Sequence, residues 1–260
     1  MQTLEHRLAD AISCLRRDGF EAALWQLVLA LARPDNLIVL GYRDAGAPLV
    51  LTRQAASPRV FARLESTYLA GAYRLDPYFE LHLRRAADGA YRIRDIAPDA
   101  FQRSRYFVEY FGETTLIDEI AVTATLAEGV SLNLCLGRDA LSGRPFAPAE
   151  VAASQRLAPV IGALARAHWQ GVAARAGPAE DTPSRLIRAA RETRGIALSP
   201  RQATVALMIL RGHSTPSIGL RLGLSPQTVK VFRKQLYRRC GISSQAELFA
   251  LMLPWLKDAA

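Results

Sequence analysis

The strongest constraint on the fold lies in the last quarter of the chain, where serines that start helices alternate with glycines that end them. Ser199-Pro200-Arg201-Gln202 combines an N-cap serine, a proline at the first helical position and a glutamine at the third, which together form a capping box. Apolar residues then recur at helical spacing until Gly212. The pattern predicts four short helices, the fourth covering Gln245 to Leu256, with boundaries at Ser199, Gly212, Ser214, Gly223, Ser225, Gly241 and Ser243 or Ser244.

The third of these helices has two distinct faces, and a glycine-containing turn joins it to the second. Two short helices joined in this way fit the helix-turn-helix unit, whose second helix enters the major groove of DNA. Lys230 and Lys234 are four residues apart and therefore share one face, where lysine can contact guanine acceptors while arginines hold phosphates. The inward face carries Val229, Phe232 and Leu236, and the lysine face also carries Gln227 and Val231.

The net charge of +9 is concentrated in the same region. From Leu198 to the C-terminus, nine Lys and Arg residues oppose Glu247 and Asp258, which gives +7. The first 197 residues hold the remaining 24 basic and 22 acidic residues, which gives +2. A concentrated basic domain indicates a polyanionic partner, and double-stranded DNA is favoured over a membrane surface.

The stretch LSPRQATVALMILRGHSTPSIGLRLGLSPQTVKVFRKQLYRRCGISSQAEL resembles the LuxR/FixJ/NarL helix-turn-helix family along its whole length. The anchors are the opening LSPRQ, then Gly212 with Ser214, the block LGLSPQTVK and the closing GISSQAEL. The resemblance implies a transcriptional regulator that binds DNA. The DNA-binding residues expected from the resemblance and the helix pattern are Ser225, Gln227, Thr228, Lys230, Val231, Arg233, Lys234 and Arg238.

Some positions depart from the pattern of the family. Gln202 stands where glutamate is usual, and Thr215-Pro216-Ser217 replaces an Asn-Lys-Glu run. Phe232 and Cys240 stand where histidine and leucine are common. Gln202 can still cap its helix, and Pro216 is expected in a first helical turn, where a missing N–H costs little. The departures therefore bear on phosphate contacts at the start of the second helix, and they leave the fold unaffected.

The last helix has two alternative roles. The resemblance implies dimerisation through this helix, and Leu248, Phe249 and Met252 could supply the surface. Core packing is the alternative, and we expect it for at least two of the three residues.

The N-terminal part predicts an α+β fold, with helices flanking an antiparallel sheet. Helices are expected over 3–33, with a break near Asp18-Gly19, over 58–87, as two helices interrupted near Asp76-Pro77, and over 98–112 and 148–169. Strands are expected over 36–42, 48–52, 91–96, 116–127 and 130–136, the last two forming a hairpin. We expect an α+β domain over residues 1–172, a linker over 173–195 and an all-α four-helix helix-turn-helix domain over 196–260; the resemblance described below implies that the first of these is a GAF- or PAS-like sensor.

Aromatic residues are concentrated in the middle of the sensor. Residues 61–111 hold eleven of the seventeen Tyr and Phe residues of the chain. Aromatic side chains with polar tips line many small-molecule pockets, and an ordinary aromatic core is the alternative for each of them. The ligand-binding residues that we expect are Tyr68, Tyr73, Asp76, Tyr106 and Tyr110.

The segment YLAGAYRLDPYF resembles the Tyr…Tyr…Asp-Pro signature of autoinducer-binding domains in LuxR-type quorum-sensing receptors. In those receptors the aspartate accepts a hydrogen bond from the ligand amide, and Tyr68 and Asp76 are the matching residues. The spacing is one residue shorter here and the tryptophan of that family is missing. RIRDIAP and FQRSRYFVEYFGETTLIDEI are more similar to orphan LuxR-type regulators of proteobacteria with GAF- or PAS-like sensors. Asp76 could alternatively serve only as a helix cap.

Asp118 and Glu119 follow the aromatic region and point to opposite sides if they lie in a strand. One of them could pair with a cationic ligand if it faced a pocket. If both are exposed or paired with arginine, they are structural, and we favour this interpretation.

Several classes of protein are excluded by the sequence. Cys14, Cys135 and Cys240 are far apart and odd in number, which fits a reducing compartment and a cytoplasmic protein, and the histidines add no metal-ligand spacing. No Gly-rich phosphate loop or nucleophile elbow is present, so neither an enzyme nor a cofactor is expected. No apolar run approaches the ~18 residues of a membrane span, and we expect no secretion signal.

The sequence therefore predicts a homodimeric DNA-binding regulator controlled by a small-molecule effector. The alternative is a regulator whose N-terminal domain is a ligand-free dimerisation or protein-interaction module. An enclosed pocket lined by Tyr68, Tyr73 and Asp76 would favour the first, and a solid core would favour the second.

Overall fold

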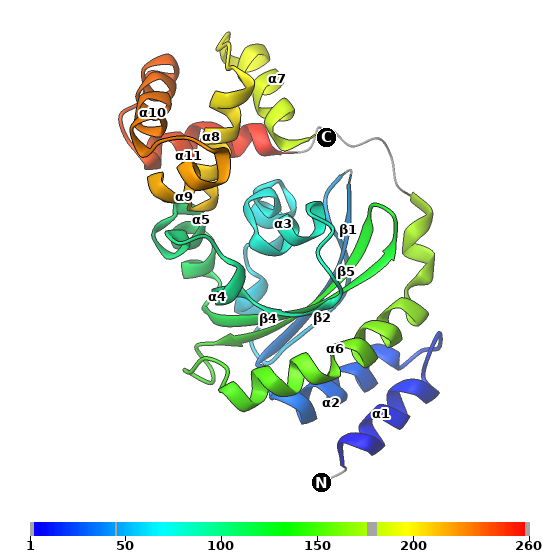
Figure 1. Ribbon diagram of the computed structural model, residues 1–260. Helices are drawn as coiled ribbons and strands as arrows, with labels where there is room; N and C mark the ends of the chain where they lie inside the picture. Colours follow the sequence, from blue (N-terminus) through cyan, green and yellow to red (C-terminus); the bar gives the residue numbers. More distant parts are fainter. Residues whose placement is uncertain (1–2, 45, 176–180, 258–260) are drawn as a thin grey trace. The chain divides into compact units, whose positions relative to one another are not determined.

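The computed structural model describes residues 3–44, 46–175 and 181–257 (Figure 1). The chain forms two compact units that do not follow its linear order. The sheet unit comprises Met1–Ala62, Leu81–Ile96 and Thr114–Pro178, and the helical unit comprises Arg63–Glu80, Ala97–Glu113 and Ala179–Ala260. The range 173–195, expected to be a linker, contains the helix α7 (Thr182–Arg194), while residues 176–180 lie outside the described residues.

The sheet unit is built on a five-stranded antiparallel sheet with the order β2-β1-β5-β4-β3. The predicted hairpin is confirmed, because β4 and β5 pair along their length and a tight turn at Glu128-Gly129 joins them. Gly129 has φ +72°, which glycine adopts without strain, and the register shifts between Thr125 and Ala127 beside this turn. The strands are β1 (Asn36–Arg43), β2 (Leu49–Ala55), β3 (Gly89–Arg92), β4 (Leu116–Ala127) and β5 (Val130–Asp139).

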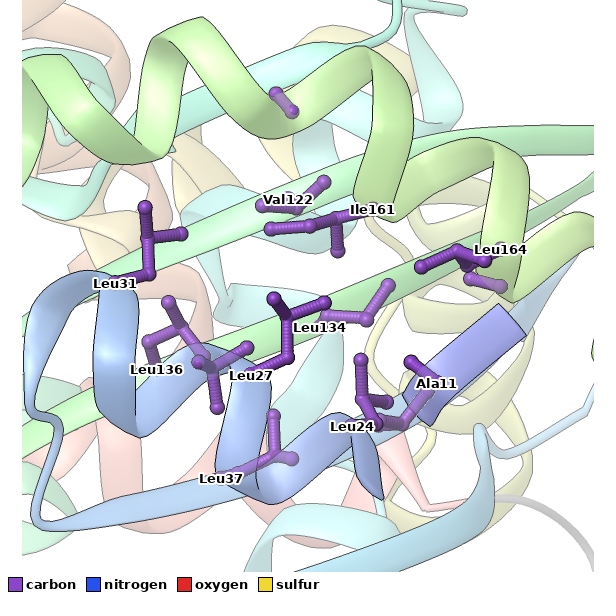
Figure 2. Packing of buried hydrophobic residues seen from close by; sticks show 14 of the residues in the cluster. Ala11, Leu24, Leu27, Leu31, Leu37, Val122, Leu134, Leu136, Ile161 and Leu164 are labelled. Atoms are coloured by element: carbon purple, nitrogen blue, oxygen red, sulfur yellow. The ribbon is translucent and has the colours of Figure 1, made fainter. Parts of the chain in front are cut away.

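Helices α2 (Phe20–Ala32) and α6 (Pro148–His168) cover one face of this sheet, and α1 (Leu4–Ser13) packs on α2 (Figure 1). Figure 2 shows the core between them, where Leu27 and Ile161 meet Leu134 of the central strand. Every helix that the structure describes is too short or too polar to cross a membrane.

The helical unit contains the four predicted C-terminal helices, α8 (Pro200–Arg211), α9 (Thr215–Leu222), α10 (Pro226–Cys240) and α11 (Gln245–Leu256). Their predicted boundaries are confirmed. The caps are Ser199, Ser214, Ser225 and Ser244, and Gly212, Gly223 and Gly241 end three of the helices in the left-handed conformation.

The segments 63–75 and 97–113 of the helical unit are single turns, so the longer helices expected there are wrong. The interruption expected near Asp76-Pro77 is confirmed, because a helix begins at Pro77. The chain breaks at Gly71, whose φ is +151°, and at Pro77. The turns are η2 (Leu64–Leu69), η3 (Ala72–Leu75), η4 (Phe101–Arg103), α5 (Arg105–Glu109) and η5 (Phe111–Glu113), and α3 (Pro77–Leu83) leads into the sheet unit. The strand expected over 91–96 is also too long, because β3 ends at Arg92 and the short helix α4 (Ile93–Ile96) follows.

Candidate DNA-binding helix and aromatic cluster

Helix α10 is fixed at its start by its own sequence. The Ser225 hydroxyl oxygen accepts a hydrogen bond from the Thr228 backbone N–H at 3.0 Å and lies 2.8 Å from the Thr228 hydroxyl. Pro226 presets the first turn. Ser225 and Thr228 therefore fix the first turn of the helix, and a phosphate would meet a preformed helix end.

The rest of α10 divides into a buried side and an exposed side. Val229 and Leu236 are buried, at 1% and 0% exposure, and Phe232 is half-buried. Lys230 and Lys234 are exposed, and Val231 is 47% exposed beside them. An apolar side chain with that exposure can contact a thymine methyl group, and the two lysines can donate hydrogen bonds to guanine. The exposed side therefore offers both kinds of contact by which a protein reads bases.

The arginines of α10 differ in what they do. Arg233 is half-buried with its guanidinium 5.1 Å from the centre of the Tyr237 ring, and Arg238 is exposed. Arg239 donates hydrogen bonds to the carbonyl oxygen of Ala197 at 2.6 Å and to the side-chain oxygen of Gln202 at 3.0 Å. Arg239 thus braces the end of α10 against the start of α8, a role that the sequence pattern did not reveal.

The turn between α9 and α10 depends on close backbone packing. The Leu224 N–H donates to the Gly219 carbonyl oxygen at 2.8 Å. A Cβ atom on Gly219 would lie 2.7 Å from the Leu224 carbonyl oxygen, so only glycine fits there. This contact sets the approach of the two helices and hence the orientation of α10.

The departures from the family pattern are accommodated as expected. Gln202 completes a capping box with Ser199, through bonds of 3.1 and 3.2 Å. Pro216 lies in the first turn of α9, and the Ser214 hydroxyl accepts from the Ser217 N–H at 3.2 Å. Next to this turn, burial lowers the pKa of His213 to about 4, so its imidazole is neutral at pH 7.

The four C-terminal helices match a known protein family. Residues 197–252 match the family described as bacterial regulatory proteins, luxR family. Residues 197–252 form a LuxR-type domain. Its second and third helices, α9 and α10, have the arrangement of a helix-turn-helix pair.

Three relatives add to this comparison, and two of them cover more of the chain than the LuxR-type domain. The chain is 27% identical over 191 residues to an Aeromonas salmonicida protein named as an HTH-type transcriptional regulator in the exeN 3′ region, covering 71% of this chain and 96% of that protein. It is 40% identical over 55 residues to the response regulator GacA of Pseudomonas aeruginosa, covering 21% of this chain and 26% of GacA. Among solved structures, it is similar to the VqsR LBD domain from Pseudomonas aeruginosa, with a TM-score of 0.54 and 26% identity over 63% of this chain and 94% of that one.

The five residues expected to bind a ligand form one aromatic cluster in the helical unit. The rings of Tyr68 and Tyr110 stack with centroids 5.4 Å apart, and those of Tyr106 and Tyr110 stack at 5.5 Å. Tyr73 lies 6.4 Å from Tyr68. All five, including Asp76, are buried. The predicted residues thus come together, and they bury one another.

Asp76 is the polar centre of this aromatic cluster. One carboxylate oxygen accepts a hydrogen bond from the Tyr68 hydroxyl at 2.7 Å, and the other accepts from the Tyr78 N–H at 2.8 Å. Burial raises the pKa of Asp76 from 3.8 to about 6, although both hydrogen bonds act in the opposite direction. Asp76 therefore caps a helix, as one alternative predicted, and also holds a tyrosine hydroxyl.

A second set of buried polar side chains lies in the sheet unit, and the sequence analysis did not identify it. The ring atom Nδ1 of His82 is 2.8 Å from the Ser131 hydroxyl, and Thr123 donates to the Asn133 side-chain oxygen at 2.6 Å. Asn133 is fully buried, and its side-chain nitrogen has no hydrogen-bond partner among the described residues. His82, Thr123 and Ser131 also line a pocket. The signal in the sequence was a row of polar residues, alternating with apolar ones, in two strands that otherwise look buried.

Asp118 lies away from that polar row. It is fully buried, its carboxylate forms an ion pair with Arg92 at 2.6 Å and lies 3.5 Å from Arg94, and it accepts from the Phe146 N–H at 3.0 Å. This arrangement is structural, as expected for Asp118. In α11, Leu248, Phe249 and Met252 are all buried, so core packing is their role in this structure.

Proposed function

We propose that this protein is a cytoplasmic, homodimeric transcriptional regulator that binds double-stranded DNA through α10. The observation that carries the proposal is the two-sided form of α10, with Val229 and Leu236 buried behind an exposed face of Lys230, Val231 and Lys234. The +7 charge of residues 198–260 supports it, because phosphate attraction supplies most of the non-specific affinity for DNA. We assign Lys230, Val231 and Lys234 to bases, with Gln227 alongside them.

The remaining predicted residues would hold the DNA backbone. Ser225 and Thr228 lie at the start of α10, and Arg233 and Arg238 lie along its flank. A single recognition helix contacts few base pairs, so two copies binding two half-sites would supply the specificity that a regulator needs. This reasoning supports the homodimer.

We further propose that residues 1–172 form a GAF- or PAS-like sensor for a small molecule, joined to the DNA-binding domain at 196–260 through the range 173–195. The five-stranded antiparallel sheet covered by helices and the similarity to the VqsR LBD domain support a sensor. The unsatisfied side-chain nitrogen of Asn133 supports a ligand with a hydrogen-bond acceptor, because a buried donor without a partner is costly. On the resemblance to autoinducer-binding domains, we also assign Asp76 and the tyrosines of the aromatic cluster to ligand binding, where the Asp76 carboxylate would accept a hydrogen bond.

The ligand-free module remains the second candidate, and a specific observation favours it. Tyr68, Tyr73, Tyr106 and Tyr110 fill space against one another, as a core without a ligand would. In that case the N-terminal domain would act through dimerisation or a protein partner. The two candidates share the DNA-binding proposal and differ only in the effector.

The DNA-binding proposal is tested with duplexes selected by the purified full-length chain from a random pool. Lys230→Ala and Lys234→Ala should each weaken binding to a selected duplex by ~1–3 kcal/mol, about five- to 150-fold, without changing the circular dichroism spectrum. Lys257→Ala is the matched control, since it removes the same charge from an exposed position outside α10. Equal affinity for Lys230→Ala and Lys257→Ala would overturn the assignment of bases to α10.

The effector is tested by mass spectrometry of small molecules released from the purified chain. A bound effector should be released from the natural chain and be depleted in Asn133→Ala. Recovery of no molecule from the natural chain, together with unaltered DNA binding, would favour the ligand-free module.

A further inference from the structure

In the helical unit, segments from the N-terminal half contact the LuxR-type domain at the corner between α8 and α9. The Ala100 N–H donates to the Gly212 carbonyl oxygen at 3.0 Å, and the Ser214 N–H donates to the Asp99 carboxylate at 3.0 Å. The fit is close, because a Cβ atom on Gly212 would lie 2.7 Å from the Cα of Phe101. Backbone therefore packs directly on backbone at this corner.

Arg211, the last residue of α8, forms a second contact with the N-terminal half. Its guanidinium makes an ion pair with Glu80 and donates two hydrogen bonds, each 3.2 Å long, to the Arg74 carbonyl oxygen. The Arg211 side chain is only 12% exposed. Because water reaches this ion pair little, removing either partner would leave the other charge poorly solvated, so the two segments are coupled at this point.

Arg74 extends these contacts to the end of α11. Its Nε donates to the Leu256 carbonyl oxygen at 3.1 Å, and the residue is 3% exposed. A Cβ atom on Gly71 would lie 2.7 Å from the Leu256 backbone. The guanidinium of Arg74 lies 4.8 Å from the centre of the Tyr73 ring, so the aromatic cluster is one residue away from these contacts.

The position of Asp99 bears on DNA binding. In a helix-turn-helix unit the first helix crosses the DNA backbone, and the N–H groups at a helix N-terminus favour phosphate. Here α9 is that first helix, and the carboxylate of Asp99 lies at its N-cap, Ser214. A carboxylate at this end both occupies a donor and repels an approaching phosphate. This contact involves α9 and leaves the exposed face of α10 as it is. Asp99 should therefore weaken contacts with the DNA phosphates rather than contacts with the bases.

We propose that Asp99, Glu80 and Arg74 form an intramolecular latch on the LuxR-type domain that lowers its affinity for DNA. The latch rests on the proposed DNA-binding function. It closes when Asp99 occupies the N-terminus of α9 and Arg211 is held by Glu80. Rearrangement of the aromatic cluster at Tyr73 opens it through Arg74. The latch gives the sensor a direct physical route to the DNA-binding domain.

The test measures binding of the full-length chain to a random-sequence duplex about three helical turns long, because phosphate contacts do not depend on sequence. Asp99→Asn keeps an acceptor for the Ser214 N–H and removes the charge. It should bind about two- to fivefold more tightly than Asp95→Asn, the size expected for a carboxylate at a helix N-terminus. Asp95→Asn is the matched control, since Asp95 is exposed on α4 and its replacement changes the net charge equally.

A second pair of variants keeps the test valid if Asp99→Asn alters the corner locally. Glu80→Gln removes the partner of Arg211 and should also strengthen binding, whereas Glu128→Gln, exposed in the turn after β4, should do so less. The latch is overturned if both variants bind no more tightly than their controls. Failure of every chain, natural and variant, to bind any duplex would instead overturn the DNA-binding proposal, so the two failures are distinguishable.

Discussion

Replacing Asp76 by asparagine should change how the stability of this protein depends on pH. The carboxylate is buried between the Tyr68 hydroxyl and the Tyr78 N–H, and burial raises its pKa from 3.8 to about 6. In the folded chain it therefore holds its proton to higher pH than in the unfolded chain. Between these two pKa values the folded state binds more protons, so the free energy of unfolding falls as the pH rises.

The size of this effect follows from the two pKa values. A pKa of about 6 in the folded state against 3.8 in the unfolded state corresponds to about 3 kcal/mol over the full titration. Between about pH 4.5 and 7.5 roughly 2 kcal/mol of it is expressed. Asp76→Asn cannot titrate, so its free energy of unfolding should rise relative to that of the natural chain by this amount across the interval.

Urea unfolding of both chains, followed by circular dichroism at several pH values, measures this difference directly. All other titrating groups are common to the two chains and cancel. Tyr68→Phe is a second variant, which keeps the carboxyl group but removes the hydrogen bond that lowers its pKa. The pKa of Asp76 should therefore rise further, and the loss of stability should extend to higher pH. A difference between Asp76→Asn and the natural chain that stays constant from about pH 4.5 to 7.5 would refute the reasoning.

Three further predictions concern the LuxR-type domain. Affinity for DNA should fall steeply with salt, and Arg238→Ala should reduce the slope of log affinity against log salt by ~0.9, because it removes one phosphate contact; an unchanged slope measured by fluorescence anisotropy would remove Arg238 from the interface. Ser225→Ala should lower the free energy of unfolding by ~1 kcal/mol, since it deletes the N-cap of α10, as thermal unfolding can show. Gly223→Ala should lower the free energy of unfolding by ~1–2 kcal/mol, because φ is +64° there and a Cβ atom would meet no neighbour within 4 Å. Gly212→Ala should lower it by a further ~1–3 kcal/mol, because its Cβ atom would also meet the Phe101 backbone. Equal losses in the two variants would show that the corner between α8 and α9 is not closely packed.

The C-terminal helices could be predicted from the sequence because their boundaries are set locally. The Ser199 capping box, the proline at the start of α9 and the left-handed glycines that end α8, α9 and α10 each act within a single turn. The inward and outward faces of α10 also follow from spacing alone. The assignment of bases to Lys230 and Lys234 stays a prediction, and the structure contributes the exposure of both side chains.

The middle of the chain was less predictable. Residues 58–75 and 98–112 have helical spacing, yet they fold as single turns. Gly71 lies against the Leu256 backbone and the Phe101 backbone lies against Gly212, and both approaches are too close for a Cβ atom. A one-dimensional pattern carries no information about such an approach. The sequence groups the aromatic residues of this region, but it does not show which residues each of them contacts.

By itself, the sequence determined the elements whose cause is local: the caps, the hairpin at Glu128-Gly129, the charge on the last quarter and the two faces of α10. Only the tertiary structure decided which distant groups meet. It brought Asp76 to Tyr68, left the amide nitrogen of Asn133 without a partner among the described residues, and placed Asp99 and Glu80 on the LuxR-type domain. The physical reason is that caps and periodicity act within one or two turns of chain, whereas burial, pKa and ion pairing depend on neighbours that folding supplies from anywhere in the sequence.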